Sequence, residues 1–148
     1  MSEHKTTLIW NRGDNAFSYN EYPRTHQWTF PRSGQSLKAA AAPEFLGGPD
    51  CVDPEEAFTA ALTSCHMLTF LAIACMSGYV IERYEDNSVG HLEKADDGKP
   101  WLAKVAMNPK IVFSGDKQPS PEDIDNLHHK AHAECFLARS VKTKVTWS

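Results

Sequence analysis

The apolar and polar residues along the chain predict strands near its beginning and one long helix after them. Residues Lys5–Trp10 form a short β-prone run, and the stretch Tyr22–Phe30 alternates with a period of two. The alternation places Arg24 and His26 on the same strand face as the aromatic residues, which is unusual for a face that should be buried. Residues 33–52 are small and rich in Gly and Pro, so they are predicted to be irregular.

A long helix is predicted to begin at Asp53 and to end near Ser77. Asp53 is a favourable N-cap, Pro54 suits the first helical position, and Glu56 completes the spacing of a capping box. Gly78 follows as the expected C-terminal stop. The helix would be about 36 Å long and is apolar or small on nearly every side. Because one subunit of this size can hardly surround such a helix, we expect a second copy of the chain to cover part of it.

The second half of the chain predicts further strands and a second helix. That helix begins at Ser120–Asp123, which repeats the cap, proline and acid arrangement, and it ends near Cys135. The expected strands are Tyr79–Tyr84, Val89–Glu93, Trp101–Met107, Ile111–Phe113 and Val141–Trp147. The order of strands, long helix, strands, helix and strand is typical of an α+β protein. No linker divides the chain, so residues 1–148 are expected to form a single domain.

Composition and charge argue against several classes of function. The chain has 148 residues with 15 basic and 19 acidic side chains and a net charge of −4, so neither nucleic acid nor an anionic membrane is an expected partner. Polar residues interrupt the longest apolar run, Ala57–Met76, so no membrane span is expected. The N-terminus carries no secretion signal, and the expected compartment is the cytoplasm. The cysteines contain no CxxC pair and are not expected to form a disulfide scaffold there.

Two cysteines have neighbours that suggest chemistry. Cys65 lies near the middle of the long helix among polar residues, which need partners that a site would provide. The alternative is that Cys65 is a small residue of the core. His128, His132 and Cys135 share one face of the second helix. That face could hold a zinc ion or bring Cys135 to Cys65 as a second thiol, or it could simply place histidines near a helix C-terminus.

Two charged residues are further candidates. Arg24 could lower the pKa of a thiol and bind an anionic oxygen, although a salt bridge at the strand margin explains it equally well. Glu55 could pair with Arg24 or could only stabilise the N-terminus of the long helix. Glu55 and Cys65 are about 15 Å apart on a straight helix. Helical spacing alone therefore does not place them in one site.

Two segments of the sequence resemble the OsmC/Ohr family of thiol peroxidases. Residues 52–66 resemble the family's helix, in which an Asn-Pro-Glu-Glu motif precedes a cysteine, and residues 133–141 resemble the segment that carries the other family cysteine. The order of strands and helices fits over nearly the whole chain. The resemblance implies an OsmC-like fold, with antiparallel sheets around a long buried central helix, and an intertwined homodimer with two active sites at its interface. The extra histidines indicate a divergent OsmC-like branch.

The resemblance also implies roles for individual residues. Cys65 matches the peroxidatic thiolate, Cys135 the resolving cysteine and Glu55 the carboxylate that orients a catalytic arginine. The implied activity is the reduction of an organic hydroperoxide, in which Cys65 becomes a sulfenic acid and Cys135 condenses with it to a disulfide. An external dithiol would restore both thiols, and no cofactor is expected.

The catalytic arginine is where this sequence departs from the OsmC branch. There the arginine lies ten residues before the acid, a position that Phe45 occupies in this chain. The Ohr branch takes its arginine from the N-terminal strands, so Arg24 is the candidate and Arg12 the reserve. Apolar walls from residues such as Phe70 and Trp28 would then favour an alkyl or lipid peroxide over hydrogen peroxide.

Two other functions stay open at this point. The first is an OsmC-like protein that binds a metal or a small ligand without peroxidase turnover, with ligands His66, His128, His132 and Cys135. The second, with less support, is a Cys/His acyl-transfer enzyme that uses Cys65, for which no oxyanion-hole motif is present.

Overall fold

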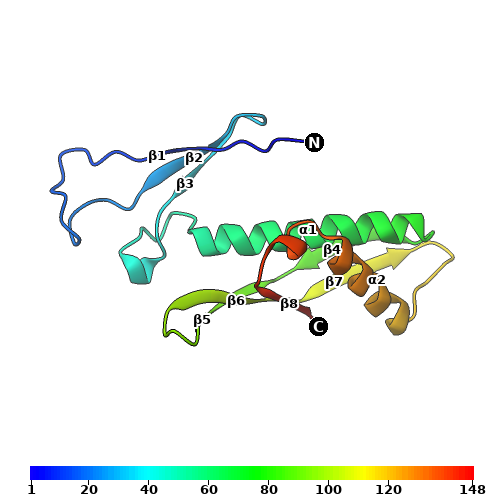
Figure 1. Ribbon diagram of the computed structural model, residues 1–148. Coiled ribbons are helices and arrows are strands. Elements are labelled where there is room, and N and C mark those ends of the chain that lie inside the picture. Colours follow the sequence, from blue (N-terminus) through cyan, green and yellow to red (C-terminus); the bar gives the residue numbers. More distant parts are fainter. The chain divides into compact units, whose positions relative to one another are not determined.

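Two α-helices and eight β-strands make up the chain in the computed structural model, which describes all 148 residues (Figure 1). The α+β class expected from the sequence is confirmed. Internal contacts divide the chain into two compact units, Met1–Ala57 and Phe58–Ser148. The single domain over residues 1–148 stays a prediction.

The first unit contains a three-stranded antiparallel sheet in the order β1-β2-β3. Its strands are β1 (Thr7–Ile9), β2 (His26–Phe30) and β3 (Gln35–Ala39). The prediction that residues 33–52 are irregular is wrong for β3, because this strand pairs with the whole of β2. A tight turn makes the pairing possible, since Gly34 takes a positive φ of 70° and donates its N–H to the Phe30 carbonyl. Cross-strand pairing therefore decides this segment, whose composition is typical of a loop. A short 3-10 helix, η1 (Pro43–Phe45), follows β3.

The long helix α1 (Pro54–Met76) begins and ends as the sequence predicts. The Asp53 carboxylate accepts the Glu56 N–H at 2.7 Å, and the Glu56 carboxylate accepts the Asp53 N–H at 3.2 Å. This reciprocal pair is the expected capping box. At the other end Gly78 takes a positive φ of 81°, and its N–H donates to the Cys75 carbonyl. The stop after α1 thus depends on a backbone conformation that glycine adopts without strain.

The second unit contains two further sheets and the helix α2 (Pro121–Glu134). One sheet pairs β4 (Val80–Asp86) with β7 (Pro109–Ser114), and the other has the order β5-β6-β8, with β5 (Val89–Lys94), β6 (Pro100–Met107) and β8 (Lys144–Trp147). All of these pairs are antiparallel except β6 with β8, which run parallel. The antiparallel sheets implied by the resemblance are confirmed, and β6 with β8 is the one parallel pair among them. The reason is the connection: α2 and the 3-10 helix η2 (Ala138–Ser140) carry the chain over before β8, which is the crossover that parallel pairing requires.

Helix α1 packs against two separate hydrophobic clusters in the second unit. Near its N-terminal half, Leu62 packs with residues of β6 and β8, which are Val105, Met107 and Val145. Towards its C-terminal half, Phe70 and Ala74 pack with Leu127 and Ala131 of α2 and with half-buried side chains of β4 and β7. Residues 65 and 66 therefore lie between the two clusters, where α1 also faces α2.

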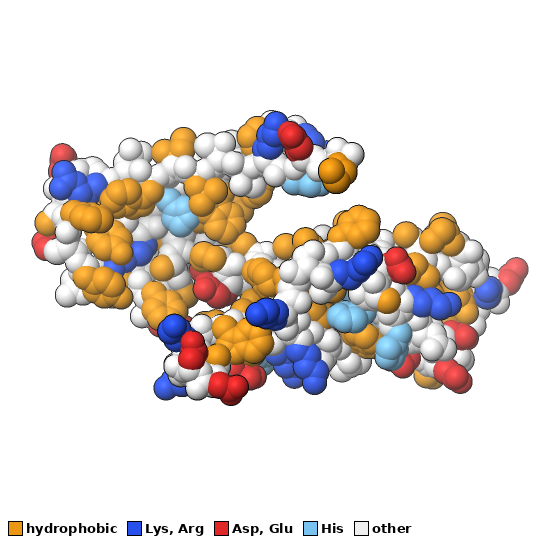
Figure 2. All heavy atoms as spheres, viewed as in Figure 1, with side chains coloured by type: hydrophobic (Ala, Val, Ile, Leu, Met, Phe, Trp, Pro, Cys, Tyr) orange, Lys and Arg blue, Asp and Glu red, His pale blue; other side chains and the backbone are white.

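Only one stripe of α1 is buried within a single chain. The buried residues are Leu62, His66, Phe70 and Ala74, which follow one another at the four-residue spacing of a helix face. Elsewhere on the helix Leu68 is 60% exposed and Met76 is 80% exposed, and apolar side chains are visible at the surface along α1 (Figure 2). The expected burial on every side is therefore absent from one chain. By length and composition alone α1 could also cross a membrane, a test that the core helix of a soluble protein passes equally.

Candidate functional site

The two cysteines singled out in the sequence lie against each other in the second unit. Cys65 is in the middle of α1, and Cys135 is the residue that caps the C-terminus of α2, with its N–H bonded to the Ala131 carbonyl. Their sulfur atoms are 2.7 Å apart although the residues are separated by 70 positions in the chain. Both are free thiols. The structure thus brings together the two groups that a two-cysteine redox reaction needs, while their individual roles stay predictions.

The two thiols have different surroundings. Cys65 is half-buried, whereas Cys135 is completely buried and donates its S–H to Cys65 Sγ. Burial, followed by this hydrogen bond, raises the pKa of the Cys135 thiol, because both favour the protonated form. The N–H of Ala138 also donates to Cys135 Sγ, which acts in the opposite direction. Cys135 is therefore held as a protonated thiol behind the more accessible Cys65.

The polar neighbours of Cys65 are mostly satisfied by structural hydrogen bonds. Thr69 donates its hydroxyl to the Cys65 carbonyl one turn back in α1, at 2.9 Å. Thr63 donates to the Ser88 hydroxyl at 2.8 Å, and Ser88 donates in turn to the Asp86 carboxylate. The two threonines therefore do not require a ligand site, because α1 itself and Ser88, between β4 and β5, provide their partners.

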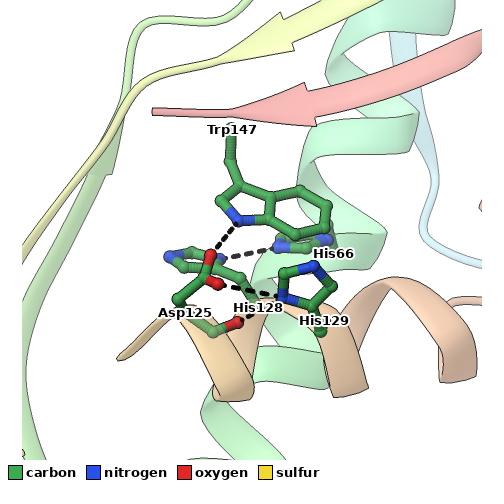
Figure 3. A network of polar contacts seen from close by, with 5 residues as sticks. All are labelled: His66, Asp125, His128, His129 and Trp147. Atoms are coloured by element: carbon green, nitrogen blue, oxygen red, sulfur yellow. Dashed lines mark hydrogen bonds and ion pairs between the residues drawn. The ribbon is translucent and has the colours of Figure 1, made fainter. Parts of the chain in front are cut away.

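Another polar neighbour of Cys65, His66, pairs with a histidine of α2. Its Nε2 lies 3.0 Å from Nδ1 of His128, and the two rings stack with an angle of 12° between their planes (Figure 3). Trp147 of β8 packs against both rings, with centroids 5.6 Å and 5.7 Å away, and donates its indole N–H to the Asp125 carboxylate at 3.1 Å. His66 and His128 are only 1% and 3% exposed. Residues of α1, α2 and β8 thus enclose one histidine pair beside the thiols.

Burial keeps both histidines neutral. It lowers the pKa of His66 to about 4, with a smaller contribution in the same direction from the nearby His128 and His132. Burial likewise lowers the pKa of His128 to about 4, against the opposing attraction of two carboxylates, Asp125 on α2 and Asp86 at the end of β4. At neutral pH the pair therefore consists of one imidazole that donates and one that accepts.

The neutral pair predicts that the protein loses stability in mild acid. In the unfolded chain each histidine binds a proton near its ordinary pKa of 6.5, but in the folded protein only near 4. The unfolded state then binds more protons than the folded state between these values, so the free energy of unfolding falls as the pH drops from about 6.5 to about 4. Each histidine would contribute a slope on the order of 1 kcal/mol per pH unit in this window.

Urea unfolding measured at several pH values checks this expectation. The variant with both His66→Gln and His128→Asn keeps polar atoms near the paired nitrogens but cannot titrate. Its stability should change less between pH 6.5 and 4 than that of the unmodified protein. An identical pH profile for the two proteins would contradict the expectation.

The structure does not assemble the alternative metal ligands into a binding group. The four residues are His66, His128, His132 and Cys135. His66 and His128 use the nitrogens that face each other for their mutual bond, and Cys135 is directed at Cys65. No cluster of three or more His, Cys, Asp or Glu side chains has an arrangement that fits a metal ion. The donor geometry therefore gives the metal-binding alternative no support.

Arg24 is held by aromatic residues of the first unit. It precedes β2 and does not lie within the strand, and its guanidinium donates to the carbonyls of Tyr22, at 2.6 Å, and of Tyr19. The guanidinium carbon also lies 3.7 Å from the centroid of the Tyr22 ring. Arg24 lines a hollow of about 480 Å³ together with apolar side chains that include Trp10 and Phe17. A cation on aromatic faces beside an open apolar hollow can bind a polarised oxygen.

The other sequence candidates lie as follows. Glu55 is half-buried in the first turn of α1 and forms no ion pair with Arg24, so the expected pairing is absent within the first unit. Arg12, the reserve arginine, is exposed in a turn. Phe70 cannot form a wall of a peroxide pocket, because it is completely buried in the cluster between α1 and α2. Trp28 is half-buried in β2 and donates its indole N–H to His26.

Sequence reasoning missed Trp147 and Asp125, which hold the histidine pair. The alternation of the last predicted strand gave one usable signal, since it places Trp147 on the same face as Val145, a core residue. No pattern in the sequence pointed to the hydrogen bond between Trp147 and Asp125.

Comparisons with known proteins identify the family and the fold of the chain. The sequence model of the family described as OsmC-like protein matches residues 47–148, more than half of the chain. An OsmC-like protein of unknown function from Vibrio cholerae is 45% identical, and the match covers 100% of this chain and 99% of that one with a TM-score of 0.92. The uncharacterized protein YmaD of Bacillus subtilis is 25% identical over 117 residues, which is 76% of each chain.

The fold is also shared with a protein whose name states a function. The organic hydroperoxide resistance protein OhrB of Bacillus subtilis superposes with a TM-score of 0.66 and 17% identity, and the match covers 99% of this chain and 98% of that one. At this identity the likeness shows the fold alone. The resemblance to OsmC/Ohr proteins that the sequence suggested is confirmed by the family match and by the Vibrio cholerae structure.

Proposed function

The chain belongs to the OsmC-like family, and from this membership and its paired thiols we propose that it is a thiol-dependent peroxidase that reduces organic hydroperoxides. The observation that carries the proposal is the 2.7 Å contact between the sulfur atoms of Cys65 and Cys135. Sulfur atoms at this distance, from segments 70 residues apart, need only a small further approach to reach the roughly 2.05 Å of a disulfide bond. The organic hydroperoxide resistance protein that shares the fold supports the same class of reaction.

The difference in accessibility between the two thiols supports a separate role for each in this proposal. Cys65, the more accessible one, attacks the outer oxygen of the hydroperoxide as a thiolate; the O–O bond breaks, Cys65 becomes a sulfenic acid, and the alkoxide takes a proton and leaves as an alcohol. Cys135 then attacks the sulfenic sulfur, which forms the disulfide and releases water. An external dithiol reduces the disulfide by exchange and returns both residues to thiols. No cofactor takes part in this cycle.

The substrate class follows from the surroundings of Arg24. In our proposal its guanidinium stabilises the thiolate of Cys65 and polarises the peroxide oxygen. The orienting role that the resemblance implies for Glu55 stays a prediction, because the Arg24 guanidinium donates to the Tyr19 and Tyr22 carbonyls and not to Glu55. The apolar side chains around the hollow at Arg24, among them Trp10 and Phe17, would bind the organic group of an alkyl or lipid peroxide. Hydrogen peroxide lacks such a group and would be the poorer substrate.

The working form in this proposal is an intertwined homodimer in the cytoplasm. The exposed apolar side chains of α1, such as Leu68 and Met76, are the surface that a second copy would cover. The four cysteines are free, which suits a reducing compartment. Neither nucleic acid nor a membrane is a partner in this proposal, since the net charge of −4 provides no basic surface for them.

The proposal is tested with the reduced protein and cumene hydroperoxide in the absence of dithiol. We expect one equivalent of peroxide to be consumed per chain, much faster than by free glutathione, and peptide mass mapping to find a disulfide between Cys65 and Cys135. The Cys75→Ser variant is the matched control, because Cys75 lies exposed on the same helix. It should behave as the unmodified protein does.

Two results would overturn the proposal. One is peroxide consumption no faster than that of the free thiol. The other is an oxidised product in which the two sulfurs are not linked to each other.

A further inference from the structure

The histidine pair joins the same two helices as the thiol pair. Cys65 and His66 are consecutive residues of α1. Cys135 caps the C-terminus of α2, and His128 lies about two turns before it in the same helix. Two side-chain hydrogen bonds connect α1 to α2 and its C-cap. One joins His66 to His128, and the other joins Cys65 to Cys135. Any sliding of one helix along the other would change both distances together.

The histidine rings are fixed on several sides. Phe70 of α1 packs against His128 with ring centroids 4.4 Å apart, and Trp147 of β8 covers both histidines. The indole N–H of Trp147 donates to the Asp125 carboxylate, and this hydrogen bond connects β8 to α2 (Figure 3). Nδ1 of His66 has no hydrogen-bond partner, so its bond to His128 is the single polar contact of a ring that is 1% exposed. A lone bond of this kind, inside a packed site, restricts the ring to one orientation.

We propose that His66 and His128 are positioning residues, which hold α1 and α2 in the register that places Cys65 Sγ against Cys135 Sγ. The apolar contacts between the helices are not directional and tolerate small shifts. The bond between the two imidazoles is directional, and if it broke, polar nitrogens would be left buried without partners. The pair therefore selects the register at which the thiols meet. Its importance for peroxide turnover rests on the proposed function, but its effect on the thiols does not.

The thiol–disulfide equilibrium tests this role without peroxide. The protein is equilibrated in mixtures of reduced and oxidised dithiothreitol, in which the two protein thiols give up two electrons and two protons to the reagent disulfide as their own disulfide forms. The equilibrium constant measures how well the fold presents the thiols to each other. In the double variant His66→Leu/His128→Leu we expect it to fall by about tenfold, the effect of losing one buried hydrogen bond that favours the paired register.

A second double variant separates positioning from packing. In His66→Gln/His128→Asn the two amides place a donor and an acceptor near the positions of Nε2 and Nδ1, so the equilibrium constant should stay within about threefold of the original. His91→Leu, which removes an exposed histidine on β5, should leave it unchanged. Urea unfolding of each variant reports stability separately, since replacing both bonded partners by apolar groups costs little stability.

The outcomes are distinct from those of the peroxide assay. An unchanged equilibrium constant in the folded double leucine variant would overturn the positioning role, even if the protein proves to be a peroxidase. If the double leucine variant does not fold, the comparison moves to His66→Gln/His128→Leu, which lacks the bond but keeps most of the volume. If the equilibrium constant of His66→Gln/His128→Leu equals that of His66→Gln/His128→Asn, the proposal is also overturned.

Discussion

Replacing Cys65 by serine is expected to abolish peroxide turnover, with a rate lowered by about a thousandfold or more, as for other nucleophile substitutions. A serine hydroxyl is not ionised near neutral pH and cannot accept the peroxide oxygen as a sulfenic acid, so the first step has no nucleophile. Cys65 is only half-buried, whereas Cys135 is completely buried and its burial raises its pKa, so the proposal gives the first step to Cys65. Peroxide consumption in the presence of excess dithiothreitol measures the loss.

Replacing Cys135 by serine should give a different result. The variant should reduce one equivalent of peroxide and then stop with a sulfenic acid on Cys65. Dimedone traps sulfenic acids, so mass spectrometry should find one dimedone adduct per chain, on Cys65. Excess peroxide should oxidise that group further to sulfinic acid, because no resolving thiol removes it. If instead Cys135→Ser loses the first reaction and Cys65→Ser keeps it, the assignment of the two roles is reversed. The Cys75→Ser variant should match the unmodified protein in both assays.

Replacing Phe70 by alanine is expected to lower the free energy of unfolding by about 3–5 kcal/mol. The Phe70 side chain is completely buried, and it packs with Ala74, Leu127 and Ala131 in the cluster that joins α1 to α2. Its ring also contacts the rings of Tyr84 and His128. Truncation would leave a cavity that these neighbours, anchored in three different elements, cannot fill by moving inward. Urea unfolding curves with an unchanged slope would measure the loss.

The matched control for Phe70 is Phe136, the residue after Cys135, which is 79% exposed. Phe136→Ala removes the same atoms but little buried area, so its effect in the single chain should stay below about 1 kcal/mol. A loss for Phe70→Ala as small as the one expected for Phe136→Ala would contradict the view that Phe70 is the centre of this cluster.

Local signals in the sequence predicted the helices better than the sheets. The capping residues Asp53 and Glu56 and the stop at Gly78 depend only on neighbours in the chain, and the structure contains all three features. Strand β3 was missed because its pairing with β2, a contact between segments, overrides its loop-like composition. The parallel pairing of β8 with β6 was missed for the same reason, since no local pattern encodes the direction of a distant partner strand.

The candidate site shows the same division. No spacing rule connects Cys65 with Cys135. The residues alone left their meeting as one of several possibilities, and the resemblance to a known family made it the expected one. The histidines were noticed as an unusual face of α2, but their chemistry depends on burial that the sequence does not state. His66 and His128 bond each other, and no three His, Cys, Asp or Glu side chains are grouped as a metal ion would require. Burial and pairing, both properties of the packed interior, are what the sequence could not supply.

Helix α1 takes part in two hydrophobic clusters, so residues far from the thiols affect how the thiols are placed. Cys65, the nucleophile of the proposed reaction, lies on the helix between Leu62 of one cluster and Phe70 of the other. A substitution in either sheet that tilts the helix slightly would therefore change the reactivity of a thiol it never touches. Selection on this chemistry would act on ordinary interior positions, so lineages that diverge in those positions would differ in reactivity while keeping both cysteines.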